Sequence, residues 1–429
     1  MIDDLLIETL AYGGAGIGRH QGKAIFVPYT APGDRVRCRV VREKKRYVVG
    51  ELVRLEVPSD RRRTPPCPVY GVCGGCQWQH MPYAEQARWK ERIFSEALRR
   101  GCGTEGPFLP LAKTDGEWGY RSRVQFKCGQ SAGAFVMGFY RRGSHSVVNI
   151  EHCPIAAAPI NKALGLFRNW LPGAPRPDSI SQVEMAVDDE NGVRATVHCL
   201  EAAAEDLGAY LAPLAEEAGL SLFLQSGRKD SLIRVRGDDN LWIRPLAGSD
   251  LRLGYGPGGF AQVNLEQNRE LVRSVRKAAG LTGRERVLDL FCGMGNFSVP
   301  LALDAEEVVG VEGYPPSIAR ARKNAAANGV SNANFLVMEA EGAVSALSRD
   351  RAFDLVVLDP PRTGAFGVTG ELLSARPKNI LYVSCDPPTL ARDLAPLLRG
   401  GYELRWSRPF DLFPQTYHVE SVTLLTRRP

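Results

Sequence analysis

Cys385 stands at a position where covalent chemistry is possible. The apolar, β-branched and aromatic run Ile380–Ser384 predicts a buried strand before it, and two prolines follow it closely. In an open α/β sheet, ligands bind at the carboxyl ends of the strands. A thiol there can act as a soft nucleophile toward carbon. The alternative is a buried cysteine that packs as a small apolar side chain.

Glu420 and His418 are the candidates for proton transfer near the C-terminus. Glu420 lies at the start of a predicted final strand, Val419–Thr426, and His418 comes shortly before it. A carboxylate or an imidazole in an active site can serve as a general base. A lone Glu on an exposed edge strand is the commoner situation, so the residues alone leave these roles open.

A glycine-containing loop, Val287–Phe297, joins a predicted strand to a helix and suits a nucleotide-like ligand. Its Gly-Met-Gly segment lets the backbone pass close to a ligand. Glu312 ends the next predicted strand, where a carboxylate can accept both hydroxyls of a ribose. A third glycine near Ser298 would indicate an NAD site, and none is there. Together with the leading Asp289, this pattern favours S-adenosylmethionine.

The motif Asp359-Pro-Pro-Arg362 ends a further predicted strand. It is related to the Asp-Pro-Pro-Tyr motif of amino methyltransferases, in which the aromatic ring stacks on a flipped base. Arg362 replaces that ring, which disfavours transfer to an exocyclic nitrogen and leaves room for a nucleophile such as Cys385. A capping or turn role for Asp359 is the simpler alternative.

Four cysteines form a candidate metal site: Cys67, Cys73 and Cys76 lie close together in the sequence, and Cys153 lies far from them. Ten cysteines spread over a long chain favour reactive or metal-bound thiols over a disulfide framework. Four thiolates suit a [4Fe–4S] cluster or a zinc ion. Structural zinc sites usually come as paired knuckles, and only Cys73 and Cys76 make a close pair, which favours iron–sulfur.

The region 259–429 alternates predicted strands with predicted helices and positions most of these residues. The strands are Arg286–Phe291, Val308–Glu312, Asp354–Asp359, Ile380–Ser384 and Val419–Thr426, and the helices are Glu266–Ala279, Pro315–Ala327 and Pro388–Leu398. This order predicts an α/β, Rossmann-like doubly wound domain.

Residues 1–58 read as short strands with glycine turns, which predicts a small β-barrel of a kind that commonly binds oligonucleotides. Along Asp34–Val41, arginines alternate with apolar residues, so one face of that strand is basic. Residues 1–63 carry 13 Lys/Arg and 8 Asp/Glu, which is +5 of the chain's net +6. Such an asymmetry suits a polyanionic partner.

Residues 59–258 form the third predicted domain. A basic linker and a helix at Pro82–Arg100 lead into a mostly β region, 106–258, with one helix near Ala202–Gly219. The sequence holds no apolar run of about 18 residues and no basic-then-apolar leader. We therefore expect a cytoplasmic protein with no membrane span.

Taken together, these motifs resemble the RNA uracil-C5 methyltransferase family, and the first 58 residues resemble a TRAM domain, an RNA-binding module. The motifs of the resemblance are Gly13–Gly18, Val27–Asp34, Phe260-Ala-Gln-Val-Asn264, Asp289–Phe297, Val311-Glu-Gly313, Leu358-Asp-Pro-Pro-Arg362, Ser384–Asp393 and the Glu420 segment. With both the TRAM domain and the cysteine set, the chain is most similar to the branch that methylates 23S ribosomal RNA.

The resemblance implies a role for each candidate residue. Cys385 would be the nucleophile and Glu420 the base, with a [4Fe–4S] cluster on Cys67, Cys73, Cys76 and Cys153. The expected contacts to S-adenosylmethionine are Gln262, Phe291, Asn296, Glu312, Glu339 and Asp359, where Glu339 departs from the shorter side chain usual at its position. RNA would be the partner of a monomeric enzyme. A transfer RNA substrate, a DNA cytosine substrate and a non-catalytic RNA-binding factor stay open.

Overall fold

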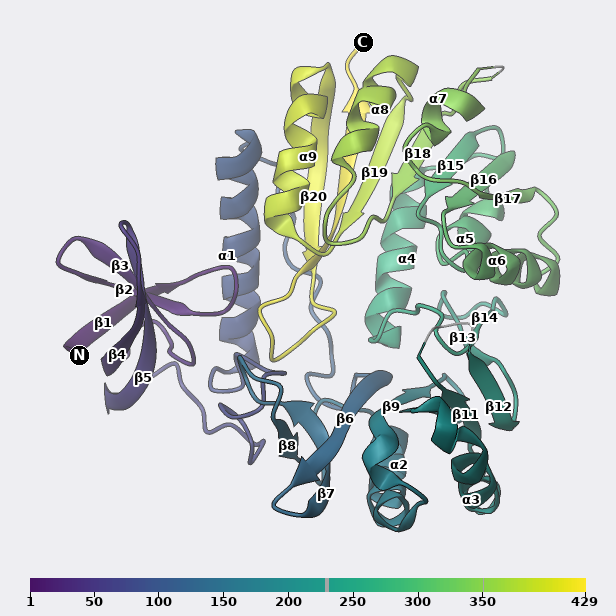
Figure 1. Ribbon diagram of the computed structural model, residues 1–429. Coiled ribbons are helices and arrows are strands. Elements are labelled where there is room, and N and C mark those ends of the chain that lie inside the picture. Colours follow the sequence, from purple (N-terminus) through teal and green to yellow (C-terminus); the bar gives the residue numbers. More distant parts are fainter. Residues whose placement is uncertain (228–230, 350) are drawn as a thin grey trace.

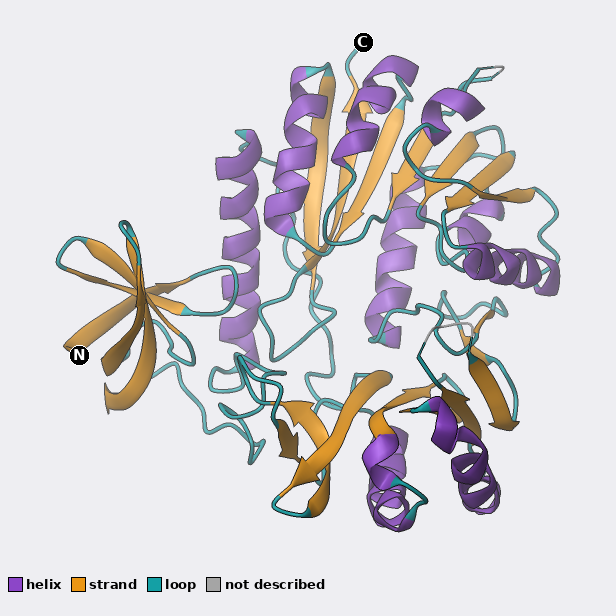
Figure 2. Cartoon of the chain, viewed as in Figure 1, coloured by secondary structure: helices purple, strands orange, loops and turns teal. Residues whose placement is uncertain are grey.

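The computed structural model describes residues 1–227, 231–349 and 351–429, and its parts are visible in Figure 1. A small barrel lies at one side, an α/β sheet with its helices forms the upper part of the view, and a second sheet lies below it. Figure 2 shows that the upper sheet lies between helices, whereas the barrel is made of strands and loops. Among the described residues, no helix is long and apolar enough to cross a membrane.

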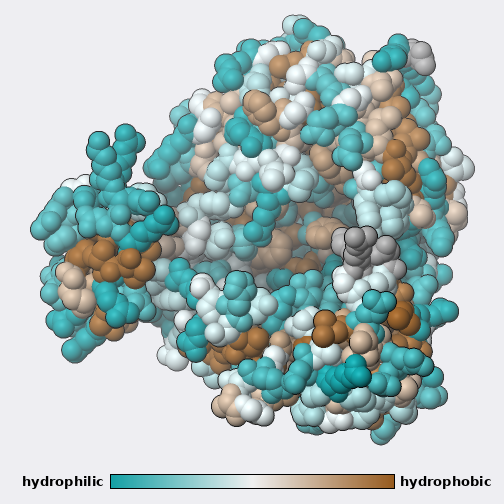
Figure 3. All heavy atoms as spheres, viewed as in Figure 1, coloured by the Kyte–Doolittle hydropathy of each residue, from teal (hydrophilic) through white to brown (hydrophobic). Residues whose placement is uncertain are grey.

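The N-terminal strands close into the predicted barrel, in the order β1-β2-β3-β5-β4. They are β1 (Ile2–Leu10), β2 (Gly16–His20), β3 (Lys23–Val27), β4 (Arg35–Glu43) and β5 (Tyr47–Val57). In β4 the arginines are exposed while Val36 and Cys38 are fully buried, as the alternation predicts, whereas Val40 is exposed because the alternation ends there. Figure 3 also shows apolar residues on the barrel's outer surface, and Leu6, Val41 and Val53 are exposed there.

The long helix α1 (Tyr83–Cys102) confirms the helix predicted at Pro82–Arg100 and joins the barrel to the α/β domain. Phe94 and Leu98 share a core with Leu390 of α9 (Pro387–Arg399). Trp89 lies in a second cluster that includes Leu10 of the barrel. Figure 1 shows α1 standing between the barrel and α9.

The central domain is a seven-stranded sheet in the order β12-β11-β10-β9-β6-β7-β8. Its strands are β6 (Arg123–Ser131), β7 (Ala134–Tyr140), β8 (Val147–Asn149), β9 (Ile180–Val187), β10 (Val193–Cys199), β11 (Ser221–Gln225) and β12 (Leu232–Arg236). The predicted helix near Ala202–Gly219 is confirmed as α3 (Ala204–Glu217). The prediction of one helix was wrong, because α2 (Ala158–Trp170) also packs here, burying Ile160, Leu164 and Phe167 at helical spacing.

The C-terminal sheet is the predicted doubly wound one, in the order β17-β16-β15-β18-β19-β21-β20. Its strands are β15 (Arg286–Leu290), β16 (Glu307–Glu312), β17 (Ala333–Val337), β18 (Leu355–Leu358), β19 (Asn379–Ser384), β20 (Tyr402–Phe410) and β21 (Glu420–Arg427). The two edge strands, β17 and β20, were not predicted. Phe335 is the one buried residue of β17, so this strand lacks the continuous apolar run of the central strands.

Successive side chains of these strands point to opposite faces of the sheet and pack into two cores, one on each face. In β15, Val287 joins the core under α4, α5 and α6, while Leu288 joins the core under α1, α7, α8 and α9. The helices not yet located are α4 (Leu265–Ala279), α5 (Ser298–Ala302), α6 (Pro315–Ala327), α7 (Ala343–Leu347) and α8 (Thr369–Ala375).

A short hairpin, β13 (Leu241–Ile243) with β14 (Leu253–Tyr255), also belongs to the core under α4. Asn324 of α6 holds it, accepting a bond from the N–H of Gly254 at 2.8 Å and donating one to its carbonyl at 3.1 Å. The core of the α/β domain thus draws on residues that precede 259. The division at residues 58 and 258 stays a prediction.

Candidate active site

The register between β19 and β21 brings Cys385 and Glu420 together. The two strands are antiparallel, and Ser384 pairs with Ser421. Cys385 follows the first residue of this pair and Glu420 precedes the second, so both lie at the same end of the sheet. The hydroxyl of Ser421 also donates to the carbonyl of Ser384 at 3.1 Å. This is the carboxyl edge of β19, where ligands bind in such sheets.

Burial and like charge shape the ionisation of this pair. Burial, and then the charges of Glu420 and Asp359, raise the pKa of the half-buried Cys385 thiol to about 12, while Arg362 acts in the opposite direction. Burial and then Asp359 raise the pKa of Glu420 well above its ordinary value. Glu420 is 3% exposed, and its Oε1 has no hydrogen-bond partner in the described part of the chain. The Cys385 thiol is therefore harder to deprotonate than an ordinary thiol, and the Glu420 carboxylate binds a proton more tightly than an exposed one does.

His418 lies close by but is a weaker proton acceptor. Burial, followed by the charges of Arg362 and Lys90, lowers the pKa of His418 to about 4. Its ring lies 4.2 Å from that of Tyr417 and 5.9 Å from that of Phe413, measured between centroids. An imidazole with this pKa is neutral at pH 7 and has a low affinity for a proton.

Four of the six residues expected to contact the cofactor line one cavity. They are Gln262, Phe291, Asn296 and Asp359, and the Gly-Met-Gly segment forms part of the same wall. Figure 3 shows a hollow between the α/β domain and the central domain, with apolar residues in its floor. The pKa of Asp359 is raised to about 7, mainly by burial.

Strain and side-chain bonding fix the loop that makes this cavity. Phe291 adopts a φ of 63°, a left-handed conformation that costs energy outside glycine and is typical of functional loops. The N–H of Cys292 donates to the carbonyl of Val311 at 3.0 Å, which ties the loop to β16. Asn296 and Asn268 exchange two amide hydrogen bonds of 3.0 Å. Backbone contacts with β16 and amide contacts with α4 therefore hold the loop in place.

Glu312 and Glu339 lie outside the lining of that cavity, at the ends of neighbouring strands. The carboxylate of the half-buried Glu312 accepts a bond from the N–H of Tyr314 at 2.9 Å. Glu339 is exposed, and its Oε1 lies 2.9 Å from where a Cβ on Gly313 would stand. The two carboxylates thus border the same turn after β16, and their roles toward a cofactor stay predictions.

The four predicted metal ligands line one cavity of about 570 Å³, which also borders Val124 of β6. They are Cys67, Cys73, Cys76 and Cys153. Within the described ranges, no three His, Cys, Asp or Glu side chains converge closely enough to hold a single metal ion. In a [4Fe–4S] cluster, four thiolates surround a whole cluster of irons. Thiols around a cavity therefore fit a cluster better than they fit one zinc ion.

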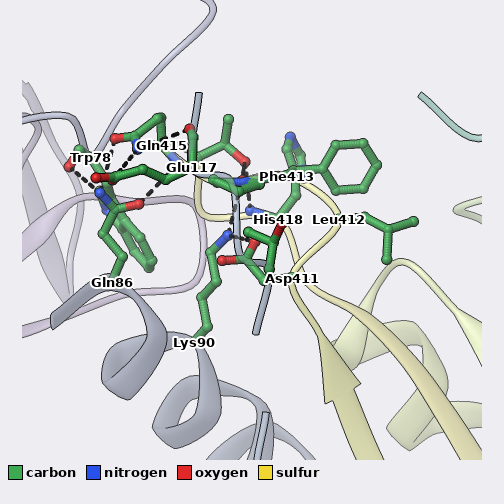
Figure 4. A network of polar contacts seen from close by, with 12 residues as sticks. Trp78, Gln86, Lys90, Glu117, Asp411, Leu412, Phe413, Gln415 and His418 are labelled. Atoms are coloured by element: carbon green, nitrogen blue, oxygen red, sulfur yellow. Dashed lines mark hydrogen bonds and ion pairs between the residues drawn. The ribbon is translucent and has the colours of Figure 1, made fainter. Parts of the chain in front are cut away.

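A buried polar network holds the segment that leads into Glu420 (Figure 4). The Lys90 ammonium of α1 lies 2.6 Å from Asp411 Oδ1 and donates to the carbonyl of Phe413 at 2.9 Å, and both charged side chains are fully buried. Farther along, Gln415 accepts from Gln86 at 2.9 Å and donates to Glu117 at 2.8 Å. An unpaired buried charge is costly, so this pairing fixes the segment against α1.

Reasoning from the sequence missed this network, although a signal was present. Gln86 and Lys90 continue, at four-residue spacing, the stripe that Phe94 and Leu98 form on the buried face of α1. Polar residues on an apolar stripe are buried only when they are paired. The identity of their partner, Asp411, could not be read from the helix.

Known proteins resemble this chain over nearly its whole length. Residues 244–428 match the family described as tRNA (Uracil-5-)-methyltransferase, and residues 4–53 match the TRAM domain. The "23S rRNA (uracil(1939)-C(5))-methyltransferase RlmD" of Shewanella sediminis is 35% identical over 98% of this chain and 95% of that protein. The protein of the same name from Alkalilimnicola ehrlichii is 36% identical over 99% and 96%.

Among solved structures, a tRNA (uracil-54, C5)-methyltransferase of Pyrococcus abyssi in complex with S-adenosyl-L-homocysteine superposes with a TM-score of 0.78. It shares 25% sequence identity, and the match covers 99% of this chain and 100% of that one. Full-length likeness and the TRAM barrel lead to one conclusion: this chain belongs to the S-adenosylmethionine-dependent RNA uracil-C5 methyltransferases.

Proposed function

We propose that this enzyme methylates a uridine of 23S ribosomal RNA through a covalent bond between Cys385 and C6 of the base. The observation that carries the proposal is the pairing of Ser384 with Ser421, beside which Cys385 and Glu420 lie next to each other. A nucleophile and a base within reach of the same bound group are the elements that such a reaction needs.

The chemistry assigns a separate task to each residue. C5 of uracil is too weakly nucleophilic to take a methyl group unaided. Addition of the Cys385 thiolate to C6 turns C4–C5 into an enolate, whose C5 then forms the new carbon–carbon bond. Bound S-adenosylmethionine supplies the electrophilic methyl group on a sulfonium centre. Glu420 then removes the C5 proton, so that the C5–C6 double bond re-forms and the thiolate leaves. The base must be flipped out of its stack to reach both groups.

Glu420 suits the second task better than His418 does. Its raised pKa, caused by burial and by Asp359, gives its carboxylate a higher affinity for a proton than an ordinary carboxylate has. His418, with its pKa lowered to about 4, binds a proton weakly at neutral pH. We therefore assign proton removal to Glu420.

The cofactor contacts are part of the same proposal. Gln262, Phe291, Asn296 and Asp359 would bind S-adenosylmethionine from the walls of their shared cavity. Glu312, at the end of β16, would accept the ribose hydroxyls, and Glu339 would lie toward the adenine.

A [4Fe–4S] cluster on Cys67, Cys73, Cys76 and Cys153 would tie loops of the central domain together. The shared cavity and the all-cysteine donor set support it. Its contribution would be to fix these loops, beside the surface that meets RNA.

Ribosomal RNA is favoured as the substrate because the similar bacterial proteins carry that substrate in their names. Transfer RNA is the second candidate, because the Pyrococcus abyssi enzyme acts on it. The exposed arginines of β4 would contact phosphates and hold the RNA in register. We also propose that the enzyme acts in the cytoplasm and as a monomer.

A denaturing gel with labelled RNA tests the covalent step. Cys385→Ala should form no adduct and transfer no methyl group. Glu420→Gln should accumulate the adduct, because the thiolate leaves only after the C5 proton is lost. RNA with 5-fluorouridine at the target should trap the wild type, because fluorine cannot leave as a cation. An adduct that persists in Cys385→Ala would move the nucleophile elsewhere, with Cys292 next. Normal turnover without an adduct in Glu420→Gln would give the base role to His418.

Mapping 5-methyluridine tests the substrate. In cells without the gene, one or more uridines of 23S ribosomal RNA should lose the methyl group and regain it on complementation. Loss confined to transfer RNA would replace the ribosomal assignment with the second candidate.

A further inference from the structure

The barrel reaches the active site through Tyr12, in the turn between β1 and β2. The hydroxyl of Tyr12 donates to Oδ2 of Asp386 at 2.7 Å, and Asp386 directly follows Cys385. The ring of Tyr12 meets the ring of Tyr417 edge-on, with centroids 5.6 Å apart and an interplanar angle of 88°. Tyr417 belongs to the segment that leads into Glu420. One side chain of the barrel therefore contacts the chain on both sides of the proposed catalytic pair.

Asp386 in turn fixes the backbone around Cys385. Its Oδ1 accepts from the N–H of Thr389 at 2.9 Å, which caps the N-terminus of α9. Its own N–H donates to the hydroxyl of Ser384 at 3.2 Å. Cys385 thus lies between the end of β19 and the start of α9, at a corner that Asp386 closes. Tyr12 donates its hydrogen bond to Oδ2 of Asp386, which is the carboxylate oxygen that does not cap the helix.

The turn that carries Tyr12 is itself held firmly. The indole N–H of Trp78 donates to the carbonyl of Gly14 at 3.0 Å. A Cβ at Gly14 would stand 3.1 Å from the Tyr417 ring, so the turn lies directly against it. Tyr12 and Tyr417 both pack on a cluster that contains Leu10 and Trp78. The hydroxyl of Tyr12 is therefore presented to Asp386 by a packed surface.

Charge gives this contact a second effect. The thiol of Cys385 is faced by Glu420, Asp359 and Asp386, which raise its pKa, and by Arg362, which lowers it. A hydrogen bond to Asp386 withdraws part of one of these negative charges from the thiol. Burial and then the bond to Asp386 raise the pKa of Tyr12, so it keeps the proton that it donates.

We propose that Tyr12 is a positioning residue of the methyl-transfer reaction, through which the barrel sets the placement of Cys385 and of the segment before Glu420. The inference rests on the proposed role of Cys385 as the nucleophile. It gives the barrel a task in catalysis beyond contact with RNA. The Tyr12 hydroxyl acts through Asp386, and its ring acts through Tyr417.

Tyr12→Phe separates the hydroxyl from the ring. The rate of adduct formation with RNA containing 5-fluorouridine, and kcat, should fall about tenfold or more, because the Asp386 carboxylate loses a charge-assisted hydrogen bond that holds it beside Cys385. KM and the Kd for RNA should stay within about twofold of wild type. Tyr210→Phe is the matched control, because it removes a hydroxyl bond of 3.0 Å to the carbonyl of Trp170, in the central domain. It should leave all four quantities unchanged.

A double-mutant cycle shows whether Tyr12 acts through Asp386. Asp386→Asn should slow adduct formation, and adding Tyr12→Phe to it should slow the reaction by less than about twofold more, because the two residues share one interaction. Thermal unfolding of each variant shows whether it is folded.

Each contrary outcome has a distinct meaning. A wild-type adduct rate in Tyr12→Phe, an equal loss in RNA affinity and rate, or full additivity with Asp386→Asn would overturn the inference while leaving Cys385 as nucleophile. A wild-type enzyme that forms no adduct would instead overturn the proposed function on which the inference rests.

Discussion

The Cys385 thiol and the four thiols that line the central-domain cavity are held in opposite ways. Cys385 follows β19, which is hydrogen-bonded along its length to β18 on one side and to β21 on the other. Cys67, Cys73 and Cys76 lie in a stretch of turns, where Cys73 makes a single isolated bridge to Arg141. The backbone of the sheet sets the position of Cys385, whereas short turns set the positions of Cys67, Cys73 and Cys76. We therefore expect the surroundings of Cys385 to keep their shape without a ligand, and the cysteine site to depend on what it binds.

Removal of one proposed cluster ligand is the strongest test of this difference. Cys153→Ser should abolish iron binding in protein purified without oxygen, where the wild type should carry about four irons per chain. RNA methylation should be lost, because the loops beside the RNA surface lose their tie, while the affinity for S-adenosylmethionine stays within about twofold. Metal analysis and calorimetry measure the two effects.

Cys128→Ser is the matched control, because Cys128 lies on β6 in the same domain and outside the cysteine cavity lining. It should keep its iron. Stoichiometric zinc without iron in the wild type would contradict the cluster. Parallel loss of cofactor affinity in Cys153→Ser would contradict the independence of the two sites.

The segment before Glu420 is held in place by side chains as well as by the sheet. Lys90→Ala leaves the Asp411 charge buried without its partner, which should lower the free energy of unfolding by about 3–5 kcal/mol. Urea denaturation measures the loss. The double variant Lys90→Met/Asp411→Leu removes both charges and should lose much less. Equal losses in the single and double variants would show that packing volume, and not the unpaired charge, is responsible.

A buried acid on the central strand β15, Asp289, gives the fold a pH-dependent cost near neutral pH. Burial raises the pKa of Asp289 from 3.8 to about 7. A raised folded-state pKa stabilises the fold below the unfolded value, and that contribution is lost as the pH rises through about 7. Asp289→Asn should therefore gain stability over wild type between pH 4 and pH 8. The gain is at most about 4 kcal/mol, for about three pKa units at about 1.4 kcal/mol each.

Chemical denaturation at several pH values measures this gain. Asp250→Asn, at an exposed position, is the control and should show no pH-dependent difference from wild type. A constant offset between Asp289→Asn and wild type across the range would mean that Asp289 does not titrate there.

The smallest expected effect concerns Glu312, the proposed ribose contact. Glu312→Ala should weaken S-adenosylmethionine binding by about 10- to 100-fold with the fold intact, since it removes hydrogen bonds to a charged group. Calorimetry measures the affinity, with Glu403→Ala, an exposed residue of β20, as the control. Unchanged affinity in Glu312→Ala would remove Glu312 from the ribose site.

The α/β domain could be predicted from sequence where its signals were local. Apolar runs such as Ile380–Ser384 gave the central strands, because both faces of these strands are buried. The helix α2 and the edge strands β17 and β20 were missed. In β17 only Phe335 is buried, so its apolar signal is weak, and α2 lies in a region whose pattern is otherwise that of strands.

The candidate site divides in the same way. Cys385 and Glu420 could be singled out because residue type and strand position indicate their chemistry. The partners that hold them could not, since Tyr12 and Asp386 are 374 positions apart and meet only after folding. Lys90 and Asp411 are likewise 321 positions apart. Such contacts follow from the docking of α1 and of the barrel turn, which no local pattern specifies.

The pairing of Ser384 with Ser421 also bears on how this enzyme can diverge. The residues between Cys385 and Glu420 include α9 and β20, yet the separation of the two ends is set by the strands that flank them. Insertions in the turns of that stretch would leave the two groups facing each other. A one-residue insertion inside β19 or β21 would turn a side chain to the other face of the sheet. Natural variation in length should therefore collect in the turns, and it should spare the strands.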